Sequence, residues 1–204
     1  MNTLLSNLEL NILSLYMADY GVRLHVREIA RLLKANHRTV SLALQRLEKN
    51  RVMDSGMVGK SKQYYLKLDA SVTKEFIKSA ESYKSISILS TNFLIKKLMN
   101  ELLLTLRTTP VILFGSYAKG TETKESDIDI VIIKDNNEPH ITKVLRDFAQ
   151  RHNKTVQIQN LSKEQFESGV RRKDHLVIEI VKNHIMLNNN EYFIDVLWRY
   201  YHER

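Results

Sequence analysis

The stretch that most constrains the fold is VILFGSYAKGTETKESDIDIVIIK at residues 111–134. The apolar tetrapeptide VILF has the composition of a buried strand and leads directly into Gly115 and Ser116. After ten further residues, Asp127 and Asp129 stand two apart at the start of a second apolar run. Because side chains two apart on a strand share a face, both carboxylates point the same way. The segment therefore predicts two strands that carry a glycine turn and a carboxylate pair.

This combination is what a site needs to hold a divalent cation against a triphosphate. Gly115 lets a ligand approach the backbone where a side chain would obstruct it. Ser116 offers a hydroxyl and an N–H to phosphate oxygens at the start of a short predicted helix. A divalent cation, Mg²⁺ or alternatively Mn²⁺, most simply relieves the repulsion between Asp127 and Asp129. Each half alone also fits an ordinary turn or an exposed strand face, but the two together favour a metal–nucleotide site.

The motif FGS, ten residues, then DIDI resembles the signature of the DNA polymerase β-like nucleotidyltransferase superfamily, in its minimal nucleotidyltransferase branch. The resemblance covers residues 108–190. It implies a mixed sheet with flanking helices, in which Gly115 and Ser116 contact nucleotide phosphates. It also implies that Asp127 and Asp129 are catalytic residues that bind Mg²⁺. The implied reaction transfers a nucleotidyl group from a nucleoside triphosphate to a hydroxyl of a protein or RNA, with pyrophosphate leaving.

Active members of that superfamily carry a third carboxylate on the next strand, and this chain departs from the pattern there. The next predicted strand, TVQIQ, places Gln157 at the expected acidic position. An amide carries no charge and cannot serve as a base. Glu164 and Glu167 follow on a predicted helix, where solvated charges are the simpler interpretation. The sequence therefore leaves open whether the domain is a working enzyme, and it favours nucleotide and metal binding over turnover.

The basic charge of the chain is concentrated in its first third. Residues 20–67 hold eleven Lys and Arg against three acidic residues, a surplus of eight that equals the net charge of the whole chain. A local surplus of this size favours a polyanionic partner. The chain has no cysteine, which excludes disulfides and thiolate metal sites. Because no signal-peptide pattern or long apolar run is visible, we expect a cytoplasmic protein without membrane association.

The basic part has the element order of a winged helix-turn-helix domain. Apolar spacing predicts three helices, and two strands joined by the basic turn VGKSK at residues 58–62 follow them. Over residues 5–68 this order resembles the winged helix-turn-helix domains of prokaryotic transcription regulators. The resemblance implies binding of double-stranded DNA; a domain used only for protein contacts is the alternative. The resemblance places five residues in the major groove at base edges: His37, Arg38, Thr39, Ser41 and Gln45. It places Lys60 and Lys62, at the hairpin turn, on DNA phosphates.

These segments together predict an α+β chain of three parts. They are a winged helix-turn-helix domain at 1–69, a helical linker at 70–107 and a nucleotidyltransferase-like domain at 108–204. The linker lacks Pro and Gly and shows two helical periodicities. We expect it to mediate a homodimer, while packing against the chain's own C-terminal domain is an equally simple arrangement.

Two functions are compatible with these patterns. In the first, the chain is a nucleotidyltransferase that uses a nucleoside triphosphate and Mg²⁺, and its N-terminal domain binds DNA. In the second, it is a DNA-binding transcription regulator or an antitoxin-like protein. Its nucleotidyltransferase domain is then catalytically weak or inactive and acts as a nucleotide sensor, or as a docking module for a toxin or another protein.

Overall fold

The structure of the chain, a computed structural model, describes residues 5–103, 105–106, 108–134 and 139–203. Residues 1–4, 104, 107, 135–138 and 204, which the predicted domains and linker include, lie outside the described residues. Two compact units are present: Met1–Glu81 with Ile194–Arg204 form the first, and Ser82–Phe193 form the second. The predicted domain boundaries after residues 69 and 107 stay predictions.

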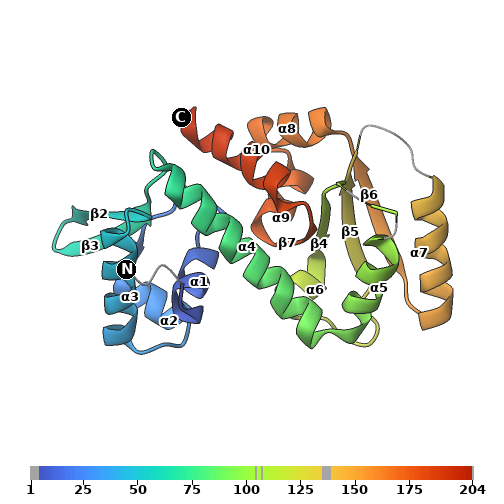
Figure 1. The fold of residues 1–204 in the computed structure, drawn as a ribbon, viewed down its shortest axis with the longest axis horizontal. Helices are drawn as coiled ribbons and strands as arrows, with labels where there is room; N and C mark the ends of the chain where they lie inside the picture. Colours follow the sequence, from blue (N-terminus) through green and yellow to red (C-terminus); the bar gives the residue numbers. More distant parts are fainter. Residues whose placement is uncertain (1–4, 104, 107, 135–138, 204) are drawn as a thin grey trace. The chain divides into compact units, whose positions relative to one another are not determined.

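The first unit combines helices with a small antiparallel sheet (Figure 1). The strand order is β1-β3-β2, and β2 and β3 form a hairpin. In chain order the elements are α1 (Asn7–Ser14), β1 (Leu24–His25), α2 (Val26–Leu32), α3 (His37–Lys49), β2 (Met53–Val58) and β3 (Ser61–Leu66). The hairpin turn is tighter than predicted, because Val58 pairs with Ser61 and leaves only Gly59 and Lys60 between the strands. Gly59 adopts a positive φ of 60° there, which glycine accepts without steric cost.

Helix α3 has a defined start and a defined buried face. The Oδ1 atom of Asn36 accepts hydrogen bonds from the backbone N–H groups of Arg38 at 2.9 Å and Thr39 at 3.4 Å, which caps the helix. Its buried residues, spaced to form one apolar stripe, are Val40, Ala43, Leu44 and Leu47. Because this stripe is buried, the opposite face of α3 is exposed to solvent.

The second unit contains a four-stranded mixed sheet with helices packed against it (Figure 1). The strand order is β6-β5-β4-β7, in which β4 is antiparallel to both neighbours and β5 is parallel to β6. The strands are β4 (Val111–Phe114), β5 (Ile128–Ile133), β6 (Val156–Leu161) and β7 (Ile185–Asn188). The helices are α5 (Phe93–Leu103), α6 (Gly115–Lys119), α7 (Pro139–His152), α8 (Lys163–Arg172) and α9 (His175–Lys182). The predicted α+β class, with a mixed sheet and flanking helices in the C-terminal half, is confirmed.

Two further helices contain residues of both units: α4 (Ser71–Thr91) and α10 (Asn190–His202). The predicted helical linker is helical in α4 and α5, which are separated at Asn92. The Asn92 Oδ1 atom accepts a hydrogen bond from the N–H of Ile95 at 3.1 Å, so this side chain starts α5. In the described part of the chain, no helix has the length and apolar character needed to cross a membrane.

The core of the second unit lies between the sheet and helices α5 and α7. Alternate residues of β5 point into it, and Ile128, Ile130 and Ile132 are fully buried. Asp129 lies between them on the other face of the strand. The alternation that buries the isoleucines therefore directs Asp129, and Asp127 before it, away from this core.

Candidate functional site

Strand pairing brings the residues of the sequence motif to one end of the second sheet. Phe114 at the end of β4 pairs with Asp129 of β5, so Gly115 follows at the position beside Asp129. Asp127 directly precedes β5, and Gln157 of β6 is the parallel-strand partner of Asp129. The predicted Gly-Ser turn and the predicted carboxylate pair thus meet, and Gln157 lies next to them.

Gly115 is required at this end of β4 for two separate reasons. Its φ of +68° is a conformation that L side chains rarely adopt. A Cβ atom at this position would also lie 2.9 Å from the Cγ atom of Asp129, inside the space of the carboxylate. The backbone of the turn therefore touches the carboxylate directly. Ser116 follows in the first turn of α6 and is partly exposed.

The two carboxylates are held close together with incomplete compensation of their charge. Burial raises the pKa of the Asp129 carboxyl above its ordinary value, and the charge of Asp127 raises that pKa further. Gln157 donates a hydrogen bond from Nε2 to Oδ2 of Asp127 at 2.8 Å, which orients this carboxylate without adding a positive charge. The donor set fits a divalent cation, because such an ion neutralises the pair and takes oxygen ligands.

Within the described residues, no group of three or more His, Asp or Glu side chains is arranged to hold a metal. A cation at Asp127 and Asp129 would therefore complete its coordination with phosphate oxygens and water, as Mg²⁺ commonly does. The two downstream carboxylates lie on α8. Glu167 accepts a hydrogen bond from the Tyr192 hydroxyl at 3.3 Å and pairs with Arg171 at 3.8 Å, and Glu164 is in the exposed first turn.

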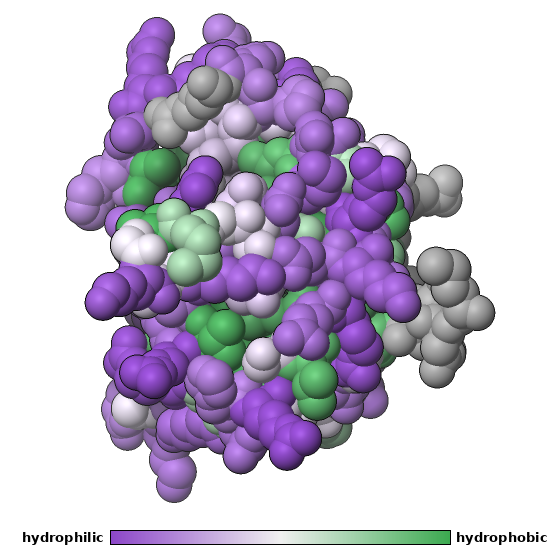
Figure 2. Space-filling view, turned by 90° about the vertical axis from the view of Figure 1, so that its left-hand side faces the viewer, coloured by the Kyte–Doolittle hydropathy of each residue, from purple (hydrophilic) through white to green (hydrophobic). Residues whose placement is uncertain are grey.

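A second group of predicted site residues lies on α3 and the β2–β3 hairpin. Figure 2, which faces the side of Figure 1 where these elements lie, shows a mostly hydrophilic surface with separate hydrophobic patches. The predicted residues that are exposed are His37, Arg38, Thr39, Gln45, Lys60 and Lys62, while Ser41 is partly buried. Leu42 on α3 is also 53 % exposed, and it was not among the predicted residues.

The basic side chains of α3 and the β2–β3 hairpin differ in whether an acidic side chain pairs with them. Lys62 donates to both carboxylate oxygens of Glu48, at 3.0 and 3.2 Å, and lies 4.8 Å from the centre of the Tyr64 ring. Arg46 pairs with Glu9 at 3.0 Å. Arg38 and Lys60 form no ion pair or side-chain hydrogen bond with any residue that the structure describes.

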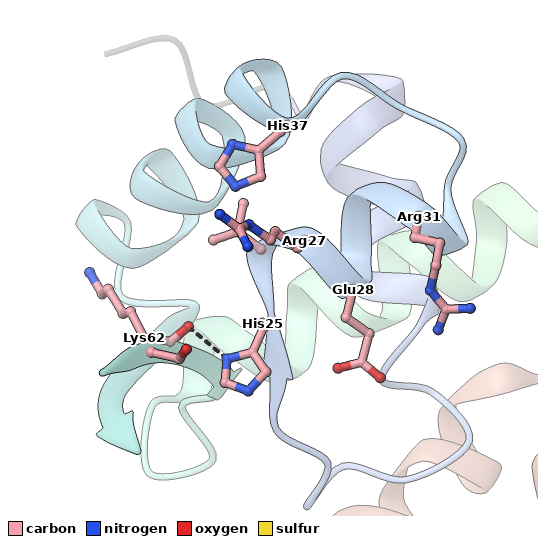
Figure 3. Close-up of a pocket in the computed structure, with 8 residues that line it drawn as sticks. His25, Arg27, Glu28, Arg31, His37 and Lys62 are labelled. Carbon is pink, nitrogen blue, oxygen red and sulfur yellow. Dashed lines mark hydrogen bonds between the residues drawn. The ribbon is translucent and has the colours of Figure 1, made fainter. Parts of the chain in front are cut away.

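Sequence reasoning missed two arginines of α2 that belong to the same part of the first unit. Arg27 and Arg31 line a cavity together with His37 (Figure 3). The signal that points to them is their spacing of four residues, which places both side chains on one face of a helix. Taken alone, this spacing is equally typical of an ordinary solvated helix face.

Comparison with protein families places the carboxylate site in a known context. Residues 95–188 match the nucleotidyltransferase domain family. The segment is a nucleotidyltransferase domain. It contains the complete four-stranded sheet with Gly115, Asp127 and Asp129. The predicted DNA polymerase β-like domain is thereby confirmed for these residues, whereas the winged helix-turn-helix identity of the first unit stays a prediction. Comparisons with curated proteins and with solved structures found no match to the chain.

Proposed function

We propose that the nucleotidyltransferase domain binds a nucleoside triphosphate with Mg²⁺ or Mn²⁺ and transfers a nucleotidyl group to a hydroxyl of a protein or RNA. The observation that carries this proposal is the contact of the Gly115 backbone with the Asp129 carboxylate inside such a domain. Gly115 and Ser116 bind phosphate oxygens, and Asp127 and Asp129 hold the cation. The cation, when bound, neutralises charge on the phosphates as it develops during transfer.

The reaction is an in-line displacement at the α-phosphorus. The acceptor oxygen forms a bond to this phosphorus while the bond to the bridging oxygen breaks and pyrophosphate leaves. The acceptor hydroxyl must lose its proton, and Gln157 cannot take it because an amide is not a base. The proton therefore passes to water or to a carboxylate of the pair. A slow enzyme is the expected consequence.

The experiment is transfer of label from each α-labelled nucleoside triphosphate, with Mg²⁺ or Mn²⁺, into protein and RNA of a cell lysate. Wild type is compared with Asp127→Ala/Asp129→Ala and with Asp147→Ala, which removes an exposed carboxylate of α7. Label that needs Asp127 and Asp129 but not Asp147 supports the proposal and identifies the acceptor. Equal labelling by the double variant refutes the assignment of these residues.

A second proposed function, for the first unit, is binding of double-stranded DNA. The specific observation in its favour is the exposed first turn of α3, where Arg38 has no acidic partner among the described residues. Lys60 at the tip of the hairpin is exposed in the same way. We expect Arg38→Ala to weaken binding of a fluorescent duplex in an anisotropy titration. Unchanged binding would remove α3 from the interface.

A different function follows if the nucleotidyltransferase domain does not catalyse nucleotidyl transfer. The chain is then a cytoplasmic, homodimeric transcription regulator or antitoxin-like protein, whose nucleotidyltransferase domain senses a nucleotide or docks a toxin or another protein. Exposed apolar side chains on α4 and α5, Ile86 at 62 % and Phe93 at 70 %, support a protein contact there. Retained nucleotide binding without label transfer would favour this alternative, and light scattering of the purified chain tests the dimer.

A further inference from the structure

A cavity of about 610 Å³ in the first unit is lined mostly by basic side chains (Figure 3). It lies among the end of β1, helix α2, the first residue of α3 and the first residues of β3. One acidic side chain, Glu28, faces five basic ones: His25, Arg27, Arg31, His37 and Lys62. A cavity with this charge balance favours an anionic ligand.

Two of the five basic side chains already have partners within the protein. The Nδ1 atom of His25 donates to the carbonyl oxygen of Lys62 at 3.3 Å, and its Nε2 atom lies 3.1 Å from the Gln63 amide nitrogen. Both ring nitrogens of His25 are therefore engaged in joining β1 to β3. The ammonium group of Lys62 is paired with Glu48. These two residues shape the cavity wall.

Arg27, Arg31 and His37 make no side-chain hydrogen bond or ion pair with any residue that the structure describes. Arg27 and Arg31 are exposed and lie one helical turn apart on α2, so their like charges repel each other in the free protein. Guanidinium groups match phosphate oxygens in geometry and can bind them with two parallel hydrogen bonds. An anion shared by both arginines removes the repulsion.

We propose that Arg27, Arg31 and His37 bind the phosphodiester backbone of double-stranded DNA. The assignment rests on the proposed DNA binding by α3, and it adds that the sugar–phosphate backbone of the DNA follows the cavity. His37 is both a wall of the cavity and the first residue of α3. A strand whose bases face α3 therefore passes its phosphates along the cavity.

A free nucleotide fits the cavity less well than a sugar–phosphate backbone does. The residues that line it include no Phe, Tyr or Trp, and Val26 is the single apolar one. The His25 ring is held by Lys62 and Gln63, so a base would find only the His37 imidazole to stack on, whereas the phosphates of a backbone need only cations. Lys62, by contrast, is a positioning residue that holds the hairpin to α3 through Glu48.

The test measures binding of a short fluorescent duplex of mixed sequence to the full chain over a range of KCl concentrations. The variants are Arg27→Gln, Arg31→Gln and their combination. Arg172→Gln, which removes an exposed cation of α8 in the second unit, is the matched control. Each arginine of α2 is expected to lower the slope of log K against log salt by about one unit, and the control is expected to leave it unchanged. Glu28→Gln should tighten binding, because it removes the one negative charge of the lining.

Three results would overturn the assignment in distinguishable ways. If Arg38→Ala weakens binding while Arg27→Gln/Arg31→Gln keeps the wild-type slope, the DNA function stands and the cavity has no part in it. If Arg38→Ala also has no effect, or no duplex binds, the proposed DNA function itself fails. If the double variant loses binding of ATP and keeps the DNA slope, the cavity is a nucleotide site. Circular dichroism of each variant verifies that the fold is retained.

Discussion

Gly115 and Gly120 both have a positive φ, 68° and 66°, yet only Gly115 lies against the Asp129 carboxylate. A Cβ atom at Gly115 would meet the Asp129 carboxylate, while a Cβ atom at Gly120 would meet nothing within 4 Å. Alanine at either position costs about 1 kcal/mol for the left-handed backbone. We expect Gly115→Ala to abolish nucleotide binding and Gly120→Ala to lose only this stability. Calorimetric titration with nucleotide and urea unfolding of both variants measure the difference. Equal binding by the two would show that the close approach has no role.

The raised pKa of Asp129 makes the stability of the folded chain depend on pH. Because its pKa is raised in the folded chain above the ordinary 3.8, the folded state holds the proton more tightly than the unfolded state does. Stability is therefore lost as the pH rises from about this ordinary value through the raised pKa. Asp129→Asn should be more stable than wild type at neutral pH in EDTA, and the gain should shrink toward pH 3.8. Urea unfolding at both pH values measures it, with Asp147→Asn as the exposed control. A destabilised Asp129→Asn at neutral pH would contradict this account.

At this scale the sequence predicted which residues lie together at the proposed nucleotide site, but not all of their contacts. The spacing from Gly115 to Asp129 was sufficient, because a strand, a turn and a strand leave few ways to arrange them. The hydrogen bond from Gln157 to Asp127 depends on the register of two parallel strands, which a single sequence does not specify. The pairing of Lys62 with Glu48 depends likewise on how the hairpin packs on α3.

Among the elements, the junction of α8 and α9 depends on one small residue. A Cβ atom at Gly169 of α8 would lie 2.5 Å from Cγ2 of Val177 on α9. We expect Gly169→Ala to destabilise the chain by about 1–3 kcal/mol through this overlap. Val177→Ala in the same chain should remove most of that loss, because it deletes the methyl groups that collide. A double-mutant cycle by urea unfolding measures the coupling. Strictly additive effects would place the strain elsewhere.

Element existence was more predictable than element limits. The helices of the basic part and the strands around the motif follow from apolar spacing. The turn predicted at residues 58–62 shortened to Gly59 and Lys60, because cross-strand pairing extends both strands to Val58 and Ser61. The polar residues at 58–62 predicted a loop, whereas the pairing of the two strands continues through Val58 and Ser61.

For the whole molecule, the end of the chain completes the core of the first unit. Tyr20 is buried and packs its ring against Trp198 and Tyr201 of α10, at centroid distances of 6.1 and 5.5 Å. No local pattern joins residues so far apart in sequence, so the predicted boundary of the first domain did not include them. The first unit is expected to lose stability when this part of α10 is removed.

The aromatic cluster gives a paired prediction. Trp198→Ala should lower the stability of the full chain by about 2 kcal/mol, less than for a fully buried ring, because Trp198 is partly exposed. Tyr20→Phe should leave stability unchanged or raise it, because the buried Tyr20 hydroxyl has no hydrogen-bond partner in the described residues. Thermal unfolding followed by circular dichroism compares the two. A large loss from Tyr20→Phe would reveal a partner for the hydroxyl.

The most direct measurement is a calorimetric titration of the full chain with nucleoside triphosphate, in Mg²⁺ and in EDTA. It tests the central claim that Asp127 and Asp129 hold a cation together with a nucleotide, independently of turnover. Wild type and Asp147→Asn are predicted to bind in Mg²⁺ and to lose binding in EDTA, while Asp127→Asn/Asp129→Asn binds in neither. Binding of equal strength in EDTA, or by the double variant, would contradict the account.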